Sequence, residues 1–239
     1  MSGSIDRPAW WLDETAHAGP EHLDAGYVAG YDRKAGTDFT ADVELLRGLG
    51  LDESGTLVDL GCGTGGMALA AAPRCRRVVA ADVSPAMLAV ARSRAAEAGL
   101  ANVECVRGGF LTYAHEGALA DAVYSRNALH HLPDFWKGIA LRRVAAMLRP
   151  GGVLRLHDLV YSFDPAEAEP AIAAWLERAA ARPDVGWTAE ELATHVREEH
   201  STYAWLLEPL LERAGFEIRE AVHRQPGTYA AYTCVKRGR

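Results

Sequence analysis

A glycine-rich turn next to two aspartates is the part of this 239-residue chain best suited to hold a charged ligand. Gly61, Gly63 and Gly66 lie where an apolar run gives way to a helical pattern, so the backbone can approach a ligand closely and offer free N–H groups. Asp59 precedes these glycines. Asp82 ends the next apolar run, where an acidic side chain commonly accepts hydrogen bonds from ribose hydroxyls. The sequence therefore predicts a cofactor site at this turn.

Two cofactors compete for the turn, because the glycine spacing also satisfies the GxGxxG pattern of dinucleotide-binding proteins. Asp59 distinguishes between them. A carboxylate at the end of the first strand would repel a pyrophosphate, whereas it suits a ligand with an ammonium group, such as the methionine moiety of S-adenosylmethionine. We therefore predict S-adenosylmethionine as the cofactor and S-adenosylhomocysteine as its product form, with an NAD-dependent dehydrogenase as the less favoured alternative.

Candidate catalytic residues follow the fourth predicted strand. His130 and His131 could supply a base that titrates near neutrality, and Arg126 and Asn127 could reach the cofactor carboxylate or the acceptor. Methyl transfer from a sulfonium is an in-line displacement that depends mainly on orientation and exclusion of water, so a base is needed only if the acceptor must lose a proton. The alternative is that the histidines simply begin the next helix.

Two further polar residues, His157 and Asp158, end the fifth predicted strand. Because the carboxyl ends of parallel strands meet at one edge, we expect both residues to face the same crevice and to bind substrate. The alternative for Asp158 is a cap on the segment that follows. The acidic and amide residues at these strand ends form no evident three-ligand set, so the sequence predicts no metal site.

The elements that position these residues alternate between β-branched runs and Ala- and Leu-rich helical stretches. Such alternation predicts a parallel sheet covered by helices. The predicted strands are Thr56–Leu60, Arg77–Ala81, Val103–Arg107, Ala122–Ser125, Gly152–Asp158, Phe216–Val222 and Tyr229–Val235. The loop between the last two is too short for a crossover helix, so these strands must pair antiparallel.

Helical patterns flank this sheet. Residues 1–55 predict a helical N-terminal segment that covers the site, with helical spacing over Phe39–Leu49. After the fifth strand there is more helix than one crossover needs, and the surplus, about 162–208, predicts a lid over the carboxyl edge. Pro209 predicts a kink or a fresh helix start. The expected fold is α/β: residues 56–239 form a doubly wound, mostly parallel seven-stranded sheet with a terminal antiparallel hairpin.

The composition narrows the partners. The chain carries 25 Lys and Arg against 32 Asp and Glu, a net charge of −7, without a basic block, which disfavours a nucleic-acid partner. No apolar run is long enough to cross a membrane, and the first residues lack the pattern of a secretory leader. We expect a cytoplasmic protein that acts on a small-molecule acceptor and has no membrane partner. The sequence leaves the oligomeric state open.

Taken together, these motifs resemble those of the class I S-adenosylmethionine-dependent methyltransferases, in the branch that acts on small molecules. The resemblance runs from Thr56 through the terminal hairpin. It rests on VDLGCGTGG for the family's first motif, AADVSPAML for the second, DAVYSRNALHHLPD for the fourth, and LRPGGVLRLHD for the turn and strand that follow.

The resemblance implies the cofactor contacts. The methionine moiety would lie on the glycines above an aspartate, a second aspartate would hold the ribose, and the next residue would touch the adenine. The implied set is Asp59, Gly61, Gly63, Gly65, Asp82 and Val83. Where many members carry an acidic residue that reaches the adenine amino group, this chain has Gly108, Gly109 and Phe110, so the backbone and the ring of Phe110 are left for that contact.

The resemblance also implies residues on the acceptor side. His131 matches the position of a base histidine in some small-molecule N-methyltransferases. Tyr31 resembles a tyrosine that such enzymes bring from an N-terminal helix onto the cofactor, and Tyr27, one helical turn away, is predicted to contact the substrate.

The expected activity is methyl transfer to a small acceptor. Nitrogen, oxygen, carbon and sulfur nucleophiles all remain open, because acceptor choice lies in the lid and loops. A regulatory or non-catalytic cofactor-binding protein and an RNA methyltransferase are the alternatives.

Overall fold

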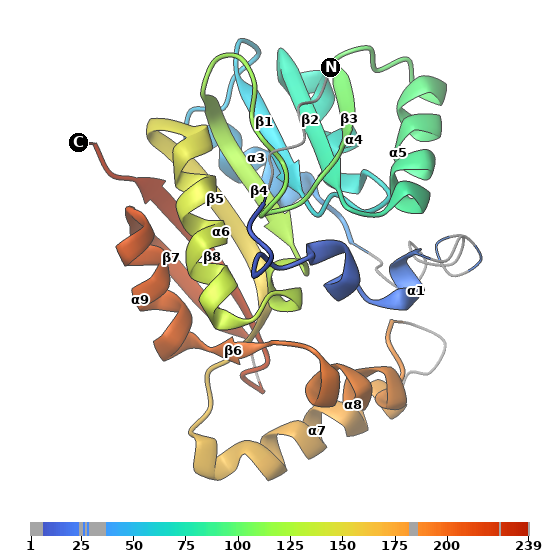
Figure 1. Ribbon diagram of the computed structural model, residues 1–239, viewed down its shortest axis with the longest axis vertical. Helices are drawn as coiled ribbons and strands as arrows, with labels where there is room; N and C mark the ends of the chain where they lie inside the picture. Colours follow the sequence, from blue (N-terminus) through green and yellow to red (C-terminus); the bar gives the residue numbers. More distant parts are fainter. Residues whose placement is uncertain are drawn as a thin grey trace.

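The computed structural model describes residues 7–23, 26, 28, 37–181, 186–224 and 226–238. Its centre is a twisted sheet with the strand order β3-β2-β1-β4-β5-β8-β7, and a short strand, β6, pairs with β5 (Figure 1). Strands β1 to β5 are parallel, whereas β8 is antiparallel to both β5 and β7. The predicted mostly parallel sheet with a terminal antiparallel hairpin is therefore confirmed.

Each predicted strand is present, with differences at its ends. The strands are β1 (Thr56–Leu60), β2 (Arg77–Asp82), β3 (Val103–Arg107), β4 (Ala120–Arg126), β5 (Leu148–Tyr161), β6 (Thr202–Tyr203), β7 (Phe216–Arg224) and β8 (Tyr229–Lys236). Strand β5 is the one that differs most from its prediction. It continues beyond Asp158 to Tyr161 because β8 and β6 both supply backbone partners there.

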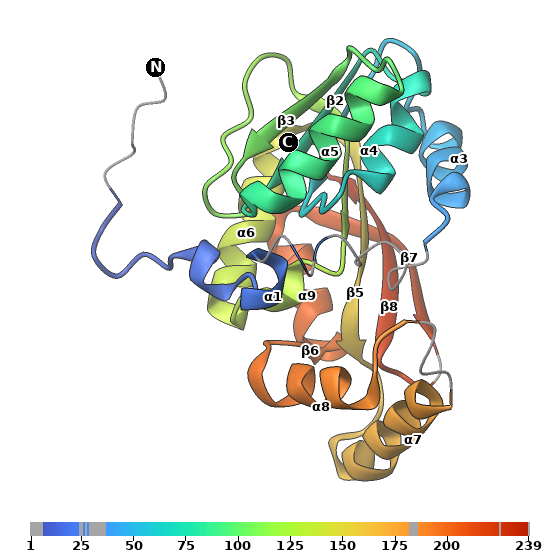
Figure 2. The ribbon, with the colours of Figure 1, turned by 90° about the vertical axis from the view of Figure 1, so that its right-hand side faces the viewer.

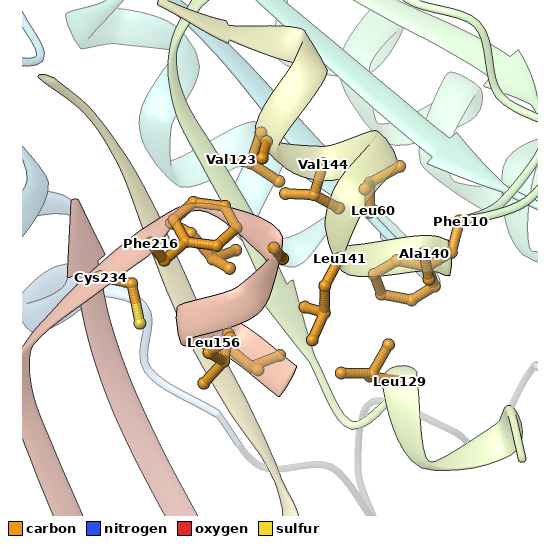
Figure 3. Close-up of a cluster of buried hydrophobic side chains, with 14 of the residues drawn as sticks. Leu60, Phe110, Val123, Leu129, Ala140, Leu141, Val144, Leu156, Phe216 and Cys234 are labelled. Atoms are coloured by element: carbon orange, nitrogen blue, oxygen red, sulfur yellow. The ribbon is translucent and has the colours of Figure 1, made fainter. Parts of the chain in front are cut away.

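Helices cover both faces of the sheet, because its central strands are buried on both sides. All five residues of β1 are buried. Leu57 faces a core formed with α3 (Thr40–Gly48), α4 (Gly66–Ala71) and α5 (Pro85–Glu97). Val58 and Leu60 face the opposite core, which α6 (Asp134–Met147) and α9 (Ala204–Ala214) complete (Figure 3). Alternate residues of β1 therefore pack into the two cores on opposite faces of the sheet.

The segment predicted as a lid contains α7 (Ala168–Ala180) and α8 (Ala189–Glu198). Both helices lie beyond the end of β5 and the start of β8 (Figure 2). Trp175 and Leu192 from these helices pack with Leu159 of β5 in a small core of their own. Helix α8 begins with the expected capping box, in which the Thr188 side chain and the Glu191 side chain bond each other's backbone.

The structure corrects the predicted end of the lid at residue 208. Helix α9 packs against α6 and β7, so it is the crossover helix of the sheet and not part of the lid. The fresh start expected at Pro209 is also wrong, because α9 runs through this proline. Trp205, at the start of α9, is 58% exposed and belongs to no described core.

The described part of the N-terminal segment contains short helices. It includes α1 (Pro20–Leu23), and α3 confirms the helix predicted over Phe39–Leu49, one residue shorter at each end. The described residues also form 3₁₀ turns at Glu14–His17, Ala72–Arg74, Leu129–His131 and Pro165–Glu167. Tyr27 and Tyr31 lie outside the described residues. Among the helices that are described, none has the length and apolar character needed to cross a membrane.

Candidate active site

Three cavities meet at the carboxyl edge of the sheet. The Asp82 cavity is lined by Glu14, His22, Asp82, Val83, Met87, Gly109, Phe110 and His131, among others. The Asp59 cavity is lined by Thr37, Phe39, Asp59, Tyr124 and Arg126, among others. The lid cavity, of about 300 Å³, is lined by His130, Leu159, Trp187, Leu192, His195, Glu199 and Tyr229, among others. Gly61 and Gly63 line the first two cavities, and Asn127 lines all three.

The glycine turn separates the Asp82 and Asp59 cavities and has a conformation that few other residues adopt. Gly61 and Gly63 have φ angles of 71° and 53°. A Cβ on Gly61 would lie 2.4 Å from the Cβ of Ala128. Gly65 differs: it precedes α4, and its nearest neighbour is Ala91 of α5. Gly65 therefore packs against α5 and is absent from the described lining of both cavities, and its predicted cofactor contact stays a prediction.

Asp82 lies at the end of β2 and organises the turn. Its two carboxylate oxygens accept the N–H groups of Gly63 and Ser84, both at 2.8 Å. Ser84 in turn caps α5 as predicted, because its Oγ accepts the N–H of Met87. Burial raises the pKa of Asp82, while the two N–H groups partly oppose this. Each oxygen keeps a lone pair toward the cavity, as a ribose contact would require.

Asp59 lies at the end of β1 and is only 2% exposed. Burial, and then the charge of Asp82, raise the pKa of Asp59 to about 8. Its Oδ2 is buried and has no hydrogen-bond partner among the described residues, although Asp59 lines the Asp59 cavity. A buried acceptor without a donor is costly. A ligand ammonium group in this cavity would remove that cost, so the residues present fit the amino-acid end of S-adenosylmethionine.

An acidic residue reaches the far end of the Asp82 cavity from an unexpected element. Glu14, in the first 3₁₀ turn, is 5% exposed and accepts the N–H groups of Gly109 at 3.2 Å and Leu111 at 2.9 Å. The hydroxyl of Thr112 also donates to it. A Cβ on Gly109 would lie 2.7 Å from Glu14 Oε2. The one signal for this contact in the sequence was that Gly108 and Gly109 stand where many members of the family carry an acidic residue.

Arg126 borders the Asp59 cavity within a buried polar network centred on Asp42 of α3. Asp42 Oδ1 accepts from Arg155 Nε at 3.0 Å and lies 2.9 Å from His157 Nε2. Its Oδ2 accepts the hydroxyl of Tyr124 at 3.1 Å and lies 3.7 Å from Arg126. Burial opposes ionisation of Asp42, but His157 and Arg155 outweigh it and hold the pKa of Asp42 well below its usual range.

His157, which was predicted to bind substrate, belongs to the same network. The ring is buried between Asp42 and Tyr124 and is missing from the described lining of all three cavities. Burial lowers the pKa of His157, although Asp42 partly offsets the effect. Its position supports a role in joining α3 to β5.

Asn127 lies where the three cavities meet. Its φ angle of 51° places it in the left-handed region, and it is the one non-glycine residue of the described chain with a positive φ. Asparagine tolerates this conformation better than most residues. Its N–H donates to the carbonyl of His157 at 2.9 Å, so the β4 end is held against β5. Strained backbone of this kind is common at functional sites.

His130 and His131 follow in a 3₁₀ turn, and both lie near Glu199. The Nδ1 of His130 bonds Asp158, and its Nε2 lies 2.9 Å from Glu199 Oε2. Asp158 is 2% exposed, also accepts the N–H groups of His130 and Leu159, and belongs to no described cavity lining. These contacts support a positioning role toward His130, and the predicted substrate contact of Asp158 stays a prediction.

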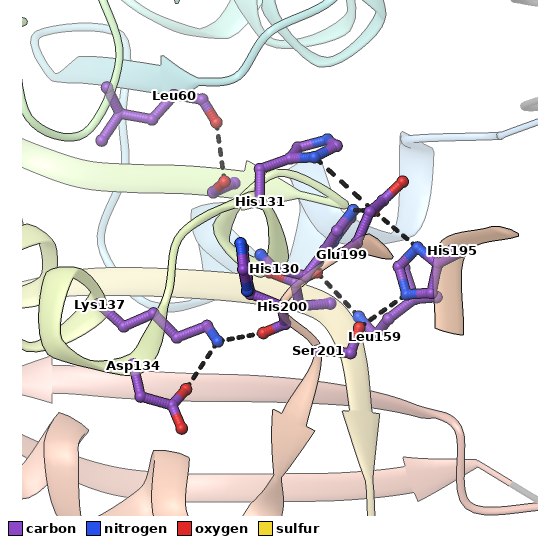
Figure 4. Close-up of polar contacts among 12 residues, drawn as sticks. Leu60, His130, His131, Asp134, Lys137, Leu159, His195, Glu199, His200 and Ser201 are labelled. Carbon is purple, nitrogen blue, oxygen red and sulfur yellow. Dashed lines mark hydrogen bonds and ion pairs between the residues drawn. The ribbon is translucent and has the colours of Figure 1, made fainter. Parts of the chain in front are cut away.

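The cluster around His130 also contains two residues that sequence reasoning missed. His195 Nδ1 lies 2.7 Å from Glu199 Oε2, and His131 Nδ1 lies 3.6 Å from the same oxygen (Figure 4). The spacing of four residues between His195 and Glu199, which places both on one helical face, was the available signal. Nothing in the sequence linked that pair to His130.

The charges in this cluster shift three pKa values. Burial opposes the charged form of His130, but Asp158 and Glu199 outweigh it and raise the pKa of His130 to about 9. Burial, with the neighbouring charge of His130, lowers the pKa of His131. Burial opposes ionisation of Glu199, but the nearby imidazoles of His130 and His195 hold its pKa well below its usual range.

Backbone contacts fix the segment that carries Glu199. The N–H of His200 donates to the carbonyl of His130 at 3.0 Å. Lys137, buried in α6, donates to Asp134 at 2.8 Å and to the carbonyl of His200 (Figure 4). The end of α8 is thereby fastened to the loop after β4.

Comparison with known proteins identifies a methyltransferase domain. The profile of a family described as a methyltransferase domain matches residues 57–152. The chain is 37% identical over 115 residues to a trans-aconitate 2-methyltransferase of Variovorax paradoxus (strain S110), a match that covers 47% of this chain and 42% of that protein. The chain thus spans less than half of the length of this curated relative.

A longer match and a solved structure extend the likeness over the remaining elements. The chain is 30% identical over 190 residues to a ubiquinone biosynthesis O-methyltransferase of Azorhizobium caulinodans, which covers 77% of this chain and 72% of that protein. The structure of a phosphoethanolamine N-methyltransferase 2 of Haemonchus contortus, in complex with S-adenosyl-L-methionine, superimposes with a TM-score of 0.71 and 16% identity, covering 97% of this chain and 62% of that one. That structural likeness shows the fold alone.

Proposed function

Because the chain belongs to the class I S-adenosylmethionine-dependent methyltransferases, we propose that it transfers the methyl group of S-adenosylmethionine to a small-molecule acceptor in the lid cavity. The observation that carries this proposal is the position of Asn127. It lines the two cavities on either side of the glycine turn and also the cavity under the lid. A cofactor that spans the turn and an acceptor under the lid would meet at this residue.

The two cavities at the turn divide the cofactor between them. We assign the amino-acid end to the Asp59 cavity, where Asp59 would pair with the ammonium group. Arg126 also lines this cavity and would bind the carboxylate. We assign the nucleoside to the Asp82 cavity, where Asp82 would hold the ribose and Val83, Phe110 and Glu14 border the adenine. When bound, the cofactor supplies an electrophilic methyl group on a sulfonium.

The protein's own contribution is orientation and exclusion of water. Trp187, Leu192 and Tyr229 give the lid cavity an apolar part, so the proposed acceptor has an apolar or aromatic body. His131 borders the Asp82 cavity beside Asn127, and we assign it the role of orienting or deprotonating the acceptor. Both ring nitrogens of His130 are already engaged, by Asp158 and Glu199, which makes it the poorer candidate.

Calorimetry with S-adenosylmethionine, S-adenosylhomocysteine and NADH tests the cofactor assignment. We expect both sulfur ligands to bind and NADH to give no heat. Binding of NADH without the other two would overturn the proposal and favour a dehydrogenase.

Incubation with a cell extract and an isotopically labelled methyl donor tests the transfer. We expect label in a small molecule, detected by mass spectrometry, that survives ribonuclease treatment of the extract. Label that disappears after ribonuclease would favour an RNA substrate, and tight cofactor binding without any labelled product would favour a regulatory protein.

A further inference from the structure

Two histidines and a glutamate in the lid cavity form a set of metal-ligand donors that the sequence did not predict. His130, His195 and Glu199 each offer one ligand atom, and these atoms all lie within 4.8 Å of one another. Two imidazoles and one carboxylate are a donor set that suits zinc and neighbouring divalent transition metals. The donors come from the loop after β4 and from the end of α8, which explains why no motif revealed them.

One nitrogen of each imidazole has a polar partner outside the set, and this contact directs the other nitrogen toward Glu199. Asp158 binds Nδ1 of His130, so this nitrogen carries the proton and Nε2 is directed toward Glu199. Ser201 lies 2.7 Å from Nε2 of His195, which leaves Nδ1 directed toward the same oxygen. Metal-binding histidines in proteins are typically held in this way, most often by a carboxylate.

The spacing needs only a small change to admit an ion. The two imidazole nitrogens lie 2.9 Å and 2.7 Å from Glu199 Oε2. A tetrahedral ion with bonds of about 2.0–2.2 Å would hold neighbouring donors about 3.4 Å apart. Relative to each imidazole nitrogen, the carboxylate oxygen would have to move by well under 1 Å, and the two nitrogens lie within 4.8 Å of each other. The bonds of His200 and Lys137 keep the segment of Glu199 in place.

Charge favours a cation at this position. Asp158 is almost fully buried, Glu199 is partly buried, and both face His130. Two carboxylates around two imidazoles match the charge of a divalent ion, which would take the place of the proton between His130 and Glu199. The rim of the cavity adds Glu190 and Glu191 to the negative side.

We propose that His130, His195 and Glu199 bind a divalent transition-metal ion, with zinc as the best match, at the wall of the lid cavity. All three residues line that cavity, so a further coordination position faces its interior. Three protein ligands with an open position are the arrangement of catalytic rather than structural zinc sites. If the proposed function holds, the ion would bind an oxygen or nitrogen atom of the methyl acceptor.

Cobalt provides a direct test, because Co²⁺ replaces Zn²⁺ and its visible spectrum reports the ligands. The full chain is freed of metal with a chelator, dialysed, and titrated with Co²⁺ and then with Zn²⁺. We expect one equivalent of Co²⁺ to produce visible absorption, and one equivalent of Zn²⁺ to remove it. A His195→Ala or Glu199→Gln variant should bind at least tenfold more weakly, and Asp158→Asn should weaken binding by about 10- to 100-fold through His130.

His200→Ala is the matched control, because His200 lies beside Glu199 in sequence but offers no atom to the set. It should keep wild-type affinity. Thermal unfolding without metal shows whether each variant is folded, and added Zn²⁺ should raise the unfolding temperature of the wild type and of His200→Ala but not of His195→Ala.

Absence of stoichiometric binding, or equal binding by wild type and by both ligand variants, would overturn the proposal and leave a cluster held by protons alone. Titration of the same metal-free protein with S-adenosylhomocysteine keeps this outcome separate from the proposed function. Cofactor binding without metal binding would reject only the metal site.

Discussion

The two halves of the site are built in different ways. The proposed cofactor half uses residues close together in sequence, Asp59 to Gly63 and Asp82 to Ser84. The backbone N–H groups of Gly63 and Ser84 hold the carboxylate of Asp82 in place. The acceptor half uses side chains from the loop after β4 and the end of α8, which meet only through tertiary contacts. The cofactor half is therefore fixed by local backbone geometry, whereas the acceptor half depends on how α8 packs against the loop after β4.

The largest effect should follow from the most local feature, the turn at Gly61. Gly61→Ala places a Cβ 2.4 Å from that of Ala128, at a φ of 71°. Overpacking and left-handed strain together should lower the free energy of unfolding by about 2–5 kcal/mol and abolish cofactor binding. Gly99→Ala, at a φ of 67° and with open space around it, is the control and should lose only about 1 kcal/mol. Chemical denaturation measures both, and equal losses would contradict the role given to Ala128.

The acceptor half can be changed without the cofactor half. His131→Ala should lower turnover roughly a hundredfold, because a positioned acid–base or orienting group is lost, while the dissociation constant of S-adenosylhomocysteine stays the same. Steady-state kinetics with an acceptor from the extract screen, together with calorimetry, make the comparison. Unchanged turnover would assign His131 to structure.

The Asp42 network tests the framework on which both halves rest. Asp42→Asn leaves Arg155 buried without its carboxylate and should lower the free energy of unfolding by about 2–4 kcal/mol at neutral pH. The folded-state pKa of Asp42 lies below its unfolded value of about 3.9, so its stabilisation is complete above that pH and is lost as the pH falls through the folded-state pKa. Denaturation curves of wild type and variant should therefore converge in acid. A difference that is constant down to low pH would reject the assigned pKa direction.

A smaller effect is expected at Glu14, which reaches the Asp82 cavity from the N-terminal segment. Its carboxylate accepts three hydrogen bonds and has room for a fourth from the adenine amino group. Glu14→Gln should weaken S-adenosylhomocysteine roughly three- to tenfold and should reduce the preference over the inosine analogue, which lacks that amino group. Competition calorimetry gives the ratio, and an unchanged preference would limit Glu14 to holding the loop of Gly109.

The sequence predicted the sheet well because its determinants are local. β-Branched runs, the glycine turn and the Ser84 cap each act within a few residues, and the structure confirms the strands they define. The role of Gly65 is harder to predict, because a left-handed glycine looks the same whether it makes room for a ligand or for the neighbouring Ala91.

The contacts that the sequence did not predict join distant elements. His157 and Asp158 lie near the carboxyl end of β5, but their partners, Asp42 and His130, cannot be inferred from their own neighbourhood. Glu14 was missed for the same reason. Alternation along a strand predicts which edge a residue reaches, and packing decides what the side chain contacts there.

The whole assignment rests on the proposed pairing of Asp59 with the ammonium group of a cofactor that lies across the glycine turn. With a pKa of about 8, Asp59 is protonated in the free protein at pH 6.5 and must lose that proton when the ammonium group binds. Titration calorimetry with S-adenosylhomocysteine at this pH, in buffers of different ionisation enthalpy, counts the protons released. We predict release approaching one proton per ligand in the wild type and little or none in Asp59→Asn, which should also bind more weakly; equal affinity and equal release in the two proteins would contradict the account.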